Sequence, residues 1–119
     1  MKICIPAEGK NGLDEKVSLH FGRAPAYALV DSETMECEFI VNKSEHFGGT
    51  GKPPEIIAES GAEVVLTSGM GPRAMQMLTE KGVEIYCGIS GTVRDSVEAF
   101  KKGYLTLASS DLACKDHRH

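Results

Sequence analysis

The sequence lacks the cysteine pairs, the long apolar runs and the basic excess that mark several classes of protein. Its four cysteines lie far apart with no CxxC pair, so we expect no disulfide framework. Neither a long apolar run nor a basic segment followed by an apolar one stands at the start, which predicts a cytoplasmic protein without membrane contact. The formal net charge of -4 argues against a broad surface for nucleic acid.

What remains is the composition of one globular domain. With 119 residues, of which 41% are hydrophobic and 25% charged, the chain is long enough to bury a core without disulfides. We expect a single domain over residues 1–108 and a polar, flexible tail over residues 109–119. Cys4 and Cys37 fall in apolar runs typical of strands, where a free thiol acts as a small core residue.

Apolar runs and turn residues predict a sheet that begins with a hairpin. A short strand over Lys2–Pro6 is followed by a polar loop from Ala7 to about Ala24. Two further strands, Ala26–Asp31 and Glu36–Val41, are separated by four residues, which suits a tight antiparallel connection. The first 41 residues therefore predict three strands with one long loop between the first two.

From residue 53 onward the pattern changes to alternating helices and strands. Proline at or near the first helical position, a Thr92/Asp95 capping box, and stop glycines at Gly61, Gly82 and Gly103 set the helix ends. Ala74, Met77 and Leu78 form the predicted apolar face of the second helix. The predicted helices are Pro53–Ser60, Gly71–Lys81 and Thr92–Gly103, the strands are Glu63–Thr67 and Glu84–Cys87, and Tyr104–Ala108 can add a short edge strand.

This order predicts an α/β fold with a five-stranded mixed sheet, strand order 3-2-1-4-5, strand 2 antiparallel, and three helices. The crossovers change direction between strands 1 and 4, and the crevice at the carboxyl ends of those strands is the expected ligand site. Three loops should converge there: the loop that contains His20, Gly69–Pro72, and Gly88–Thr92.

The chemistry of these loops suits an anion. Two of them are glycine-rich and lead into helix N-termini, where unpaired backbone N–H groups favour negative charge, and Arg23 and Arg73 can add fixed positive charge. Phosphate is one candidate ligand, but neither a full GxGxxG motif nor a Walker lysine motif is present. The loops alone therefore leave the identity of the ligand open.

A second signal lies at the end of the chain. Cys114, His117 and His119 place one soft and two borderline metal donors within six residues. With a further ligand from elsewhere, these donors suit a divalent or copper ion. The alternative is a solvated terminus without a metal.

Three segments together carry a resemblance to a known family. They are Asp14-Glu-Lys-Val-Ser-Leu-His-Phe-Gly-Arg-Ala-Pro25, Gly69-Met-Gly-Pro-Arg-Ala74, and Gly82-Val-Glu-Ile-Tyr86 with Gly91-Thr-Val93 after it. The combination resembles the dinitrogenase iron-molybdenum cofactor biosynthesis family, which includes NifX, the C-terminal domain of NifB and small stand-alone members. The resemblance covers nearly the whole chain.

The resemblance implies a ribonuclease H-like three-layer fold without catalytic activity. It also implies noncovalent, transient binding of an iron-sulfur or molybdenum-containing metal-sulfur cluster, received from a donor protein and passed to an acceptor protein by a monomer or weak dimer. His20 would be the cluster-contacting ligand, with Arg23 beside it, and Met70 can add a thioether contact. The site residues so implied are His20, Phe21, Gly22, Arg23, Gly69, Met70 and Gly71.

Two other classes of function stay open. A ribonuclease H-like fold can hold Mg²⁺ on carboxylates for phosphoryl transfer, and Asp14, Asp31 and Glu36 are available, although none lies in a strand interior next to another. The other class is a small interaction module that responds to a metal or a nucleotide through the tail or the glycine loops.

Overall fold

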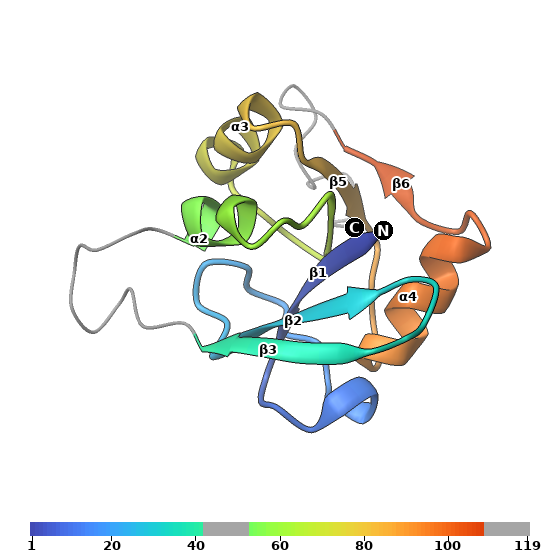
Figure 1. The fold of residues 1–119 in the computed structure, drawn as a ribbon. Coiled ribbons are helices and arrows are strands. Elements are labelled where there is room, and N and C mark those ends of the chain that lie inside the picture. The colour runs from blue at the N-terminus through green and yellow to red at the C-terminus, as the bar shows by residue number, and fades with distance from the viewer. Residues whose placement is uncertain (42–52, 109–119) are drawn as a thin grey trace.

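A computed structural model describes residues 1–41 and 53–108 of the chain. Figure 1 shows one mixed sheet with helices on both of its faces. The strands are β1 (Lys2–Ala7), β2 (Ala26–Asp31), β3 (Cys37–Val41), β4 (Val64–Thr67), β5 (Glu84–Cys87) and β6 (Thr106–Leu107). The helices are α2 (Pro53–Glu59), α3 (Pro72–Glu80) and α4 (Val93–Lys101), with a 3-10 turn at Gly12–Asp14.

The order of the described strands is β3-β2-β1-β4-β5-β6. β2 runs antiparallel to both of its neighbours, and β1, β4 and β5 run parallel, so the predicted order and the antiparallel second strand are confirmed. The predicted count of five is wrong, because β6 adds a sixth strand antiparallel to β5 through the pairs Tyr86↔Leu107 and Cys87↔Thr106. β6 is the short edge strand that the sequence allowed over Tyr104–Ala108 but that the count of five left out, and only Thr106–Leu107 of that segment forms it.

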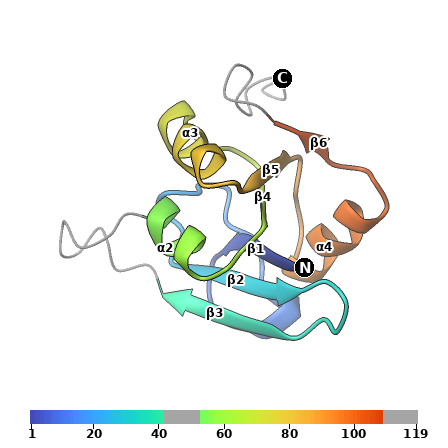
Figure 2. The ribbon, with the colours of Figure 1, turned by 45° about the horizontal axis from the view of Figure 1, so that its top comes forward.

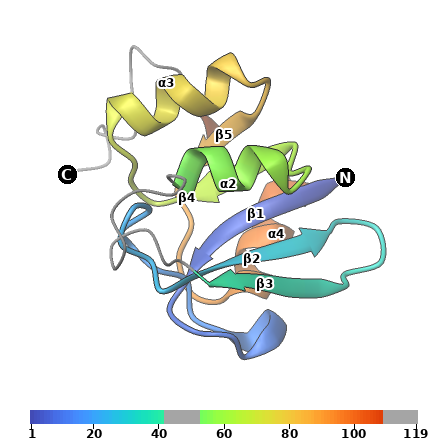
Figure 3. The same ribbon diagram turned by 60° about the vertical axis from the view of Figure 1, so that its left-hand side comes forward.

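β1 lies in the centre of the sheet and is buried on both faces. Cys4 joins Tyr27 and Leu29 in one core cluster, while Ile3 and Ile5 belong to the other. The alternation follows from the two-residue period of a strand. Figures 2 and 3 show α2 and α3 on one face of the sheet and α4 on the other, which gives the predicted three layers.

The helix ends follow the predicted signals. Thr92 accepts a hydrogen bond from the Asp95 backbone while the Asp95 carboxylate accepts one from Thr92, so the capping box is confirmed. Gly61, Gly82 and Gly103 have φ values of 91°, 84° and 79°, the left-handed conformation in which helices commonly stop.

The apolar face of α3 is rotated relative to the prediction. Met75 and Leu78 are fully buried, whereas Ala74 and Met77 are half-buried. Leu78 confirms the predicted face, and Met75 confirms the interpretation that it packs in the core or at its rim. The buried arc differs from the predicted face because α3 packs beside α2 as well as on the sheet. Among residues 1–41 and 53–108, no helix has the length and apolar character needed to cross a bilayer.

Candidate functional site

A hollow of about 450 Å³ opens between the β1–β2 loop and the β4–α3 loop. It lies beyond the carboxyl ends of β1 and β4, where β1 has an antiparallel neighbour on one side and a parallel one on the other. This is the predicted switch point of the sheet. The hollow is lined by Leu19, His20, Phe21, Gly22, Arg23, Gly69, Met70, Gly71 and Ala74. All seven residues implied by the family resemblance are among them.

The stem of the β1–β2 loop is held firmly by backbone hydrogen bonds. The Ser18 N–H donates to the Pro6 carbonyl at 2.8 Å, and the Val17 N–H donates to the Gly91 carbonyl at 3.0 Å. Val17 also bridges to Ala7 at the end of β1. The predicted long polar loop is thus anchored to β1 and to the start of α4, and only its tip borders the hollow.

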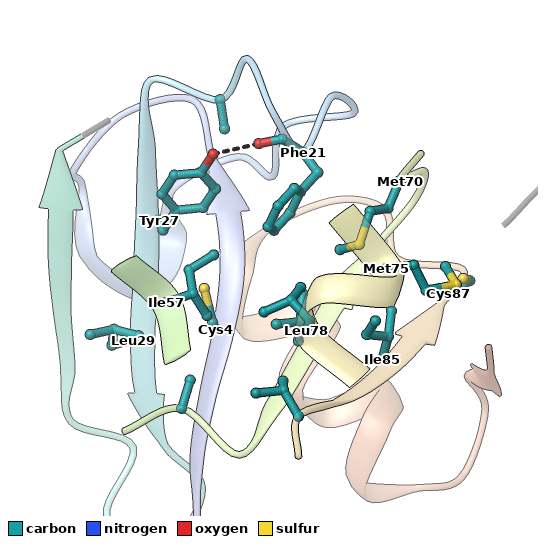
Figure 4. Close-up of a cluster of buried hydrophobic side chains, with 14 residues drawn as sticks. Cys4, Phe21, Tyr27, Leu29, Ile57, Met70, Met75, Leu78, Ile85 and Cys87 are labelled. Atoms are coloured by element: carbon teal, nitrogen blue, oxygen red, sulfur yellow. Dashed lines mark hydrogen bonds between the residues drawn. The ribbon is translucent and has the colours of Figure 1, made fainter. Parts of the chain in front are cut away.

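The tip of this loop is fixed by Phe21. Its side chain is 3% exposed and belongs to the core cluster beneath α3, and its ring centroid lies 5.4 Å from that of Tyr27. The Tyr27 hydroxyl donates to the Phe21 carbonyl at 2.6 Å (Figure 4). His20 and Arg23 on either side are exposed. Burial of one aromatic ring therefore holds two polar side chains at the rim.

The β4–α3 loop forms the facing wall. The Ser68 hydroxyl donates to the Leu19 carbonyl at 3.3 Å and so ties the two walls together. The Thr67 hydroxyl lies 3.3 Å from the Gly69 nitrogen and 3.1 Å from its carbonyl oxygen. Met70 is 8% exposed and packs with Met75 in the core (Figure 4). Met70 thus lines the floor of the hollow while its side chain fills the core.

Two residues of the lining were missed at the sequence level. Leu19 is 60% exposed on the rim, and Ala74 faces the hollow from the first turn of α3. Both adjoin predicted site residues, so proximity in the sequence was the available signal. An exposed leucine beside a histidine carries no motif that would single it out.

The third predicted loop meets the β1–β2 loop at its stem and not at this hollow. Gly88–Thr92 does not line this hollow, because the start of α4 packs against the loop stem instead. The Val93 N–H donates to the Glu15 carbonyl at 2.8 Å, and the Asp95 carboxylate accepts from the Thr92 N–H at 3.1 Å. These internal partners occupy donors that the prediction assigned to an anion.

Of the carboxylates of the phosphoryl-transfer alternative, Asp31 and Glu36 border another hollow at the far end of β1, and Asp14 lies apart from them. Asp14 pairs with Arg94 at 3.4 Å, and Asp31 lies opposite Lys2 at the other end of β1 from the hollow. In the part of the chain that the structure describes, no three His, Cys, Asp or Glu side chains are grouped as a metal site would need. The described residues therefore offer no carboxylate cluster for two-metal catalysis.

The three cysteines of the described strands, Cys4, Cys37 and Cys87, do not line the hollow. Cys87 is disulfide-bonded, which departs from the expectation that the cysteines stay free, whereas Cys4 and Cys37 are free. Cys4 is fully buried, and burial raises the pKa of its thiol far above the ordinary value. Cys37 is half-buried, and its pKa is raised by burial and by the neighbouring Glu38. The burial of both thiols supports the prediction that Cys4 and Cys37 act as small core residues. Cys114, His117 and His119 lie outside the described residues, so the tail metal site stays a prediction.

The fold and the hollow together define a small three-layer α/β protein with an open, glycine-lined hollow at the switch point of its sheet. Residues 1–103 match the dinitrogenase iron-molybdenum cofactor family, and the chain therefore belongs to this family. The predicted family is thus confirmed.

Two solved structures and one further protein are similar to this chain. The apo form of the orange protein from Desulfovibrio gigas is 35% identical, with 90% of this chain and 92% of that one covered and a TM-score of 0.82. A proposed NifB protein from Thermotoga is 32% identical, with 89% and 91% covered and a TM-score of 0.76. A Methanocaldococcus jannaschii protein of uncharacterised function is 26% identical over 111 residues, which are 88% of this chain and 89% of that protein.

Proposed function

We propose that this protein is a non-catalytic carrier that binds an iron-sulfur or molybdenum-iron-sulfur cluster in the hollow. Family membership and the NifB-like neighbour support a role in the biosynthesis or carriage of iron-molybdenum cofactor. The cluster is cargo, received from a donor protein and released to an acceptor protein.

The observation that carries the proposal is the arrangement of His20 and Arg23. Both are exposed at the rim of the hollow, on a loop tip fixed by buried Phe21, and both face the loop Gly69–Gly71. His20 offers one imidazole nitrogen as an exchangeable ligand. No acidic residue and no cysteine is among the described residues that line the hollow.

This lining suits the chemistry of the cargo. Metal-sulfur clusters are anionic, and their sulfides accept hydrogen bonds from backbone N–H groups. Arg23 adds a fixed positive charge in a chain whose net charge is -4, so the attraction is local to the site. Several thiolates would hold a cluster too firmly for release, whereas one imidazole permits exchange.

The test is anaerobic reconstitution with ferrous iron, sulfide and molybdate, followed by visible absorption and metal counting. We expect the wild type to load and His20→Ala to lose the cluster while its thermal unfolding is unchanged, because the His20 side chain is exposed. A full-length variant with Cys114→Ser, His117→Ala and His119→Ala is the matched comparison. Loading that ignores His20 and disappears in this tail variant contradicts the proposal.

The remaining finer features are proposed with it. We infer that the fold is of the ribonuclease H-like type. We also infer that the protein is a monomer or a weak dimer, and light scattering across a concentration series measures which of the two it is. A further divalent or copper ion on Cys114, His117 and His119 would appear as a metal equivalent that the tail variant loses and His20→Ala keeps.

A further inference from the structure

The two walls of the hollow differ in what they present to a ligand. The β1–β2 loop presents the exposed side chains of His20 and Arg23. The opposite wall is Gly69-Met-Gly71, and its one side chain, Met70, is turned into the core with Phe21 and Met75. The outer surface of that wall is therefore bare main chain.

Neither glycine of this wall is demanded by the fold. Gly71 has φ -67° and ψ 158°, a conformation open to any residue, and Gly69 is also outside the left-handed region. A Cβ on Gly71 would meet no heavy atom of residues 1–41 and 53–108 within 4 Å. A Cβ on Gly69 would have its nearest contact at 3.9 Å, to the Leu19 carbonyl, an ordinary van der Waals distance.

Gly82, just after α3, is by contrast a glycine that the backbone conformation requires. Its φ of 84° lies in the left-handed region, which strains every residue that carries a Cβ. A Cβ there would also meet no described atom within 4 Å. Gly82 is thus explained by its backbone, while Gly69 and Gly71 are explained neither by backbone nor by packing.

We propose that Gly69 and Gly71 determine which cargo this protein accepts, because the cargo rests directly on the main chain of this wall. A compact inorganic anion has no flexible groups that could bend around a methyl group, so it reaches the backbone only where Cβ atoms are absent. His20 then contacts the cargo from the facing wall. The inference rests on the proposed function. It adds where the cargo makes contact, on the main chain of Gly69–Gly71, and that Cβ atoms at these positions would limit which cargo fits.

The test uses three single-residue variants to separate an effect on cluster retention from an effect on the stability of the fold. Gly71→Ser places a residue that is favoured just before a helix, and Gly69→Ala adds one methyl group. We expect both to unfold at or above the wild-type denaturant midpoint. After reconstitution with ferrous iron, sulfide and molybdate, each variant should lose its cluster to a chelator about tenfold faster than the wild type. This is the size of effect that one added carbon group has in a closely fitting pocket.

Gly82→Ala is the matched control. It should lose stability because alanine is strained at a φ of 84°, and it should retain its cluster as the wild type does. Variants at Gly69 and Gly71 that retain the cluster like the wild type overturn the inference. Variants there that unfold as readily as Gly82→Ala overturn it as well, since the glycines would then serve the fold.

The outcomes also separate this inference from the proposed function. A wild type that takes up no cluster contradicts both. Loading that depends on His20 but is unchanged in both glycine variants contradicts this inference alone.

Discussion

The hydroxyl of Tyr27 donates to the backbone carbonyl of Phe21 at 2.6 Å, inside the core beneath the hollow. Tyr27 is 1% exposed and pairs with Pro6 of the central strand, so its position is fixed by the sheet. The bond transmits that fixed position to the loop tip, because Phe21 lies directly between His20 and Gly22. The rim of the hollow is thus held from below.

Removal of this hydroxyl should loosen the tip. Tyr27→Phe keeps the ring that packs on Phe21 and deletes the donor of the 2.6 Å bond, while the longer 3.5 Å bond from the Ala24 N–H to the same carbonyl stays. We expect a loss of about 1 kcal/mol in the free energy of unfolding, measured by denaturant titration. Amide hydrogen exchange of residues 20–23 should also become faster.

Tyr86→Phe is the control for this change. The Tyr86 ring packs on Phe100 with centroids 5.0 Å apart, and its side chain is only half-buried. Its hydroxyl deletion should alter the unfolding free energy by less than about 0.5 kcal/mol. Equal losses in the two variants would contradict a special role for the Tyr27 bond.

Arg23→Gln should weaken cargo binding without altering the fold. The side chain is exposed at the rim, so the unfolding free energy should stay within about 0.5 kcal/mol of the wild type. Loss of one charge-assisted contact predicts about tenfold weaker retention of the cluster, measured by transfer to a chelator. The difference should shrink at high salt, where exposed charges are screened.

Arg94→Gln offers the same chemical change away from the hollow. Arg94 pairs with Asp14 on the surface at 3.4 Å, beside the loop stem. We expect its cluster retention to match the wild type. If both arginine variants lose the cluster equally, net charge rather than the placement of Arg23 is responsible.

Thr92→Ala should destabilise the protein and leave cargo binding intact. The substitution removes the side-chain acceptor for the Asp95 N–H at the start of α4. Loss of an N-cap predicts about 1 kcal/mol lower unfolding free energy. Thr79→Ala, at an exposed position inside α3, should instead leave stability unchanged or slightly higher because alanine is the better helix former.

The pH dependence of stability should carry a contribution from Asp31. Its carboxylate accepts hydrogen bonds from the Glu33 and Thr34 N–H groups at 2.8 and 3.2 Å, and these bonds lower its pKa below the ordinary value. A carboxyl with a lowered folded-state pKa stabilises the fold above its unfolded-state pKa, and this stabilisation is lost as pH falls through the folded-state value.

Asp31→Asn makes this measurable. The stability difference between wild type and variant should be largest near neutral pH and shrink on acidification below about pH 4. Chemical denaturation at a series of pH values gives the difference, and NMR titration of the carboxyl gives the direction of the pKa shift. A difference that grows on acidification would contradict the assigned cause.

Local sequence signals predicted the parts of the fold that depend on neighbours in the chain. The Thr92/Asp95 capping box and the stop at Gly82 involve residues within a few positions, and both are confirmed. The strand count of five was wrong, because the pairing of Thr106–Leu107 with β5 depends on a distant element, although an edge strand was allowed over Tyr104–Ala108. The half-burial of Ala74 and Met77 likewise depends on how α3 packs against α2 and the sheet.

The sequence by itself determined the order of the strands and helices, the helix ends, and the family motif around His20, since periodicity and capping are local. The topology also predicted that Gly69–Gly71 meets the loop of His20, and both line the hollow. Only the tertiary structure decided the place of the third loop: Gly88–Thr92 meets the loop stem, because backbone donors at the start of α4 found partners there. It also divided one motif between core and surface, with Phe21 buried against Tyr27 and His20 left exposed at the rim.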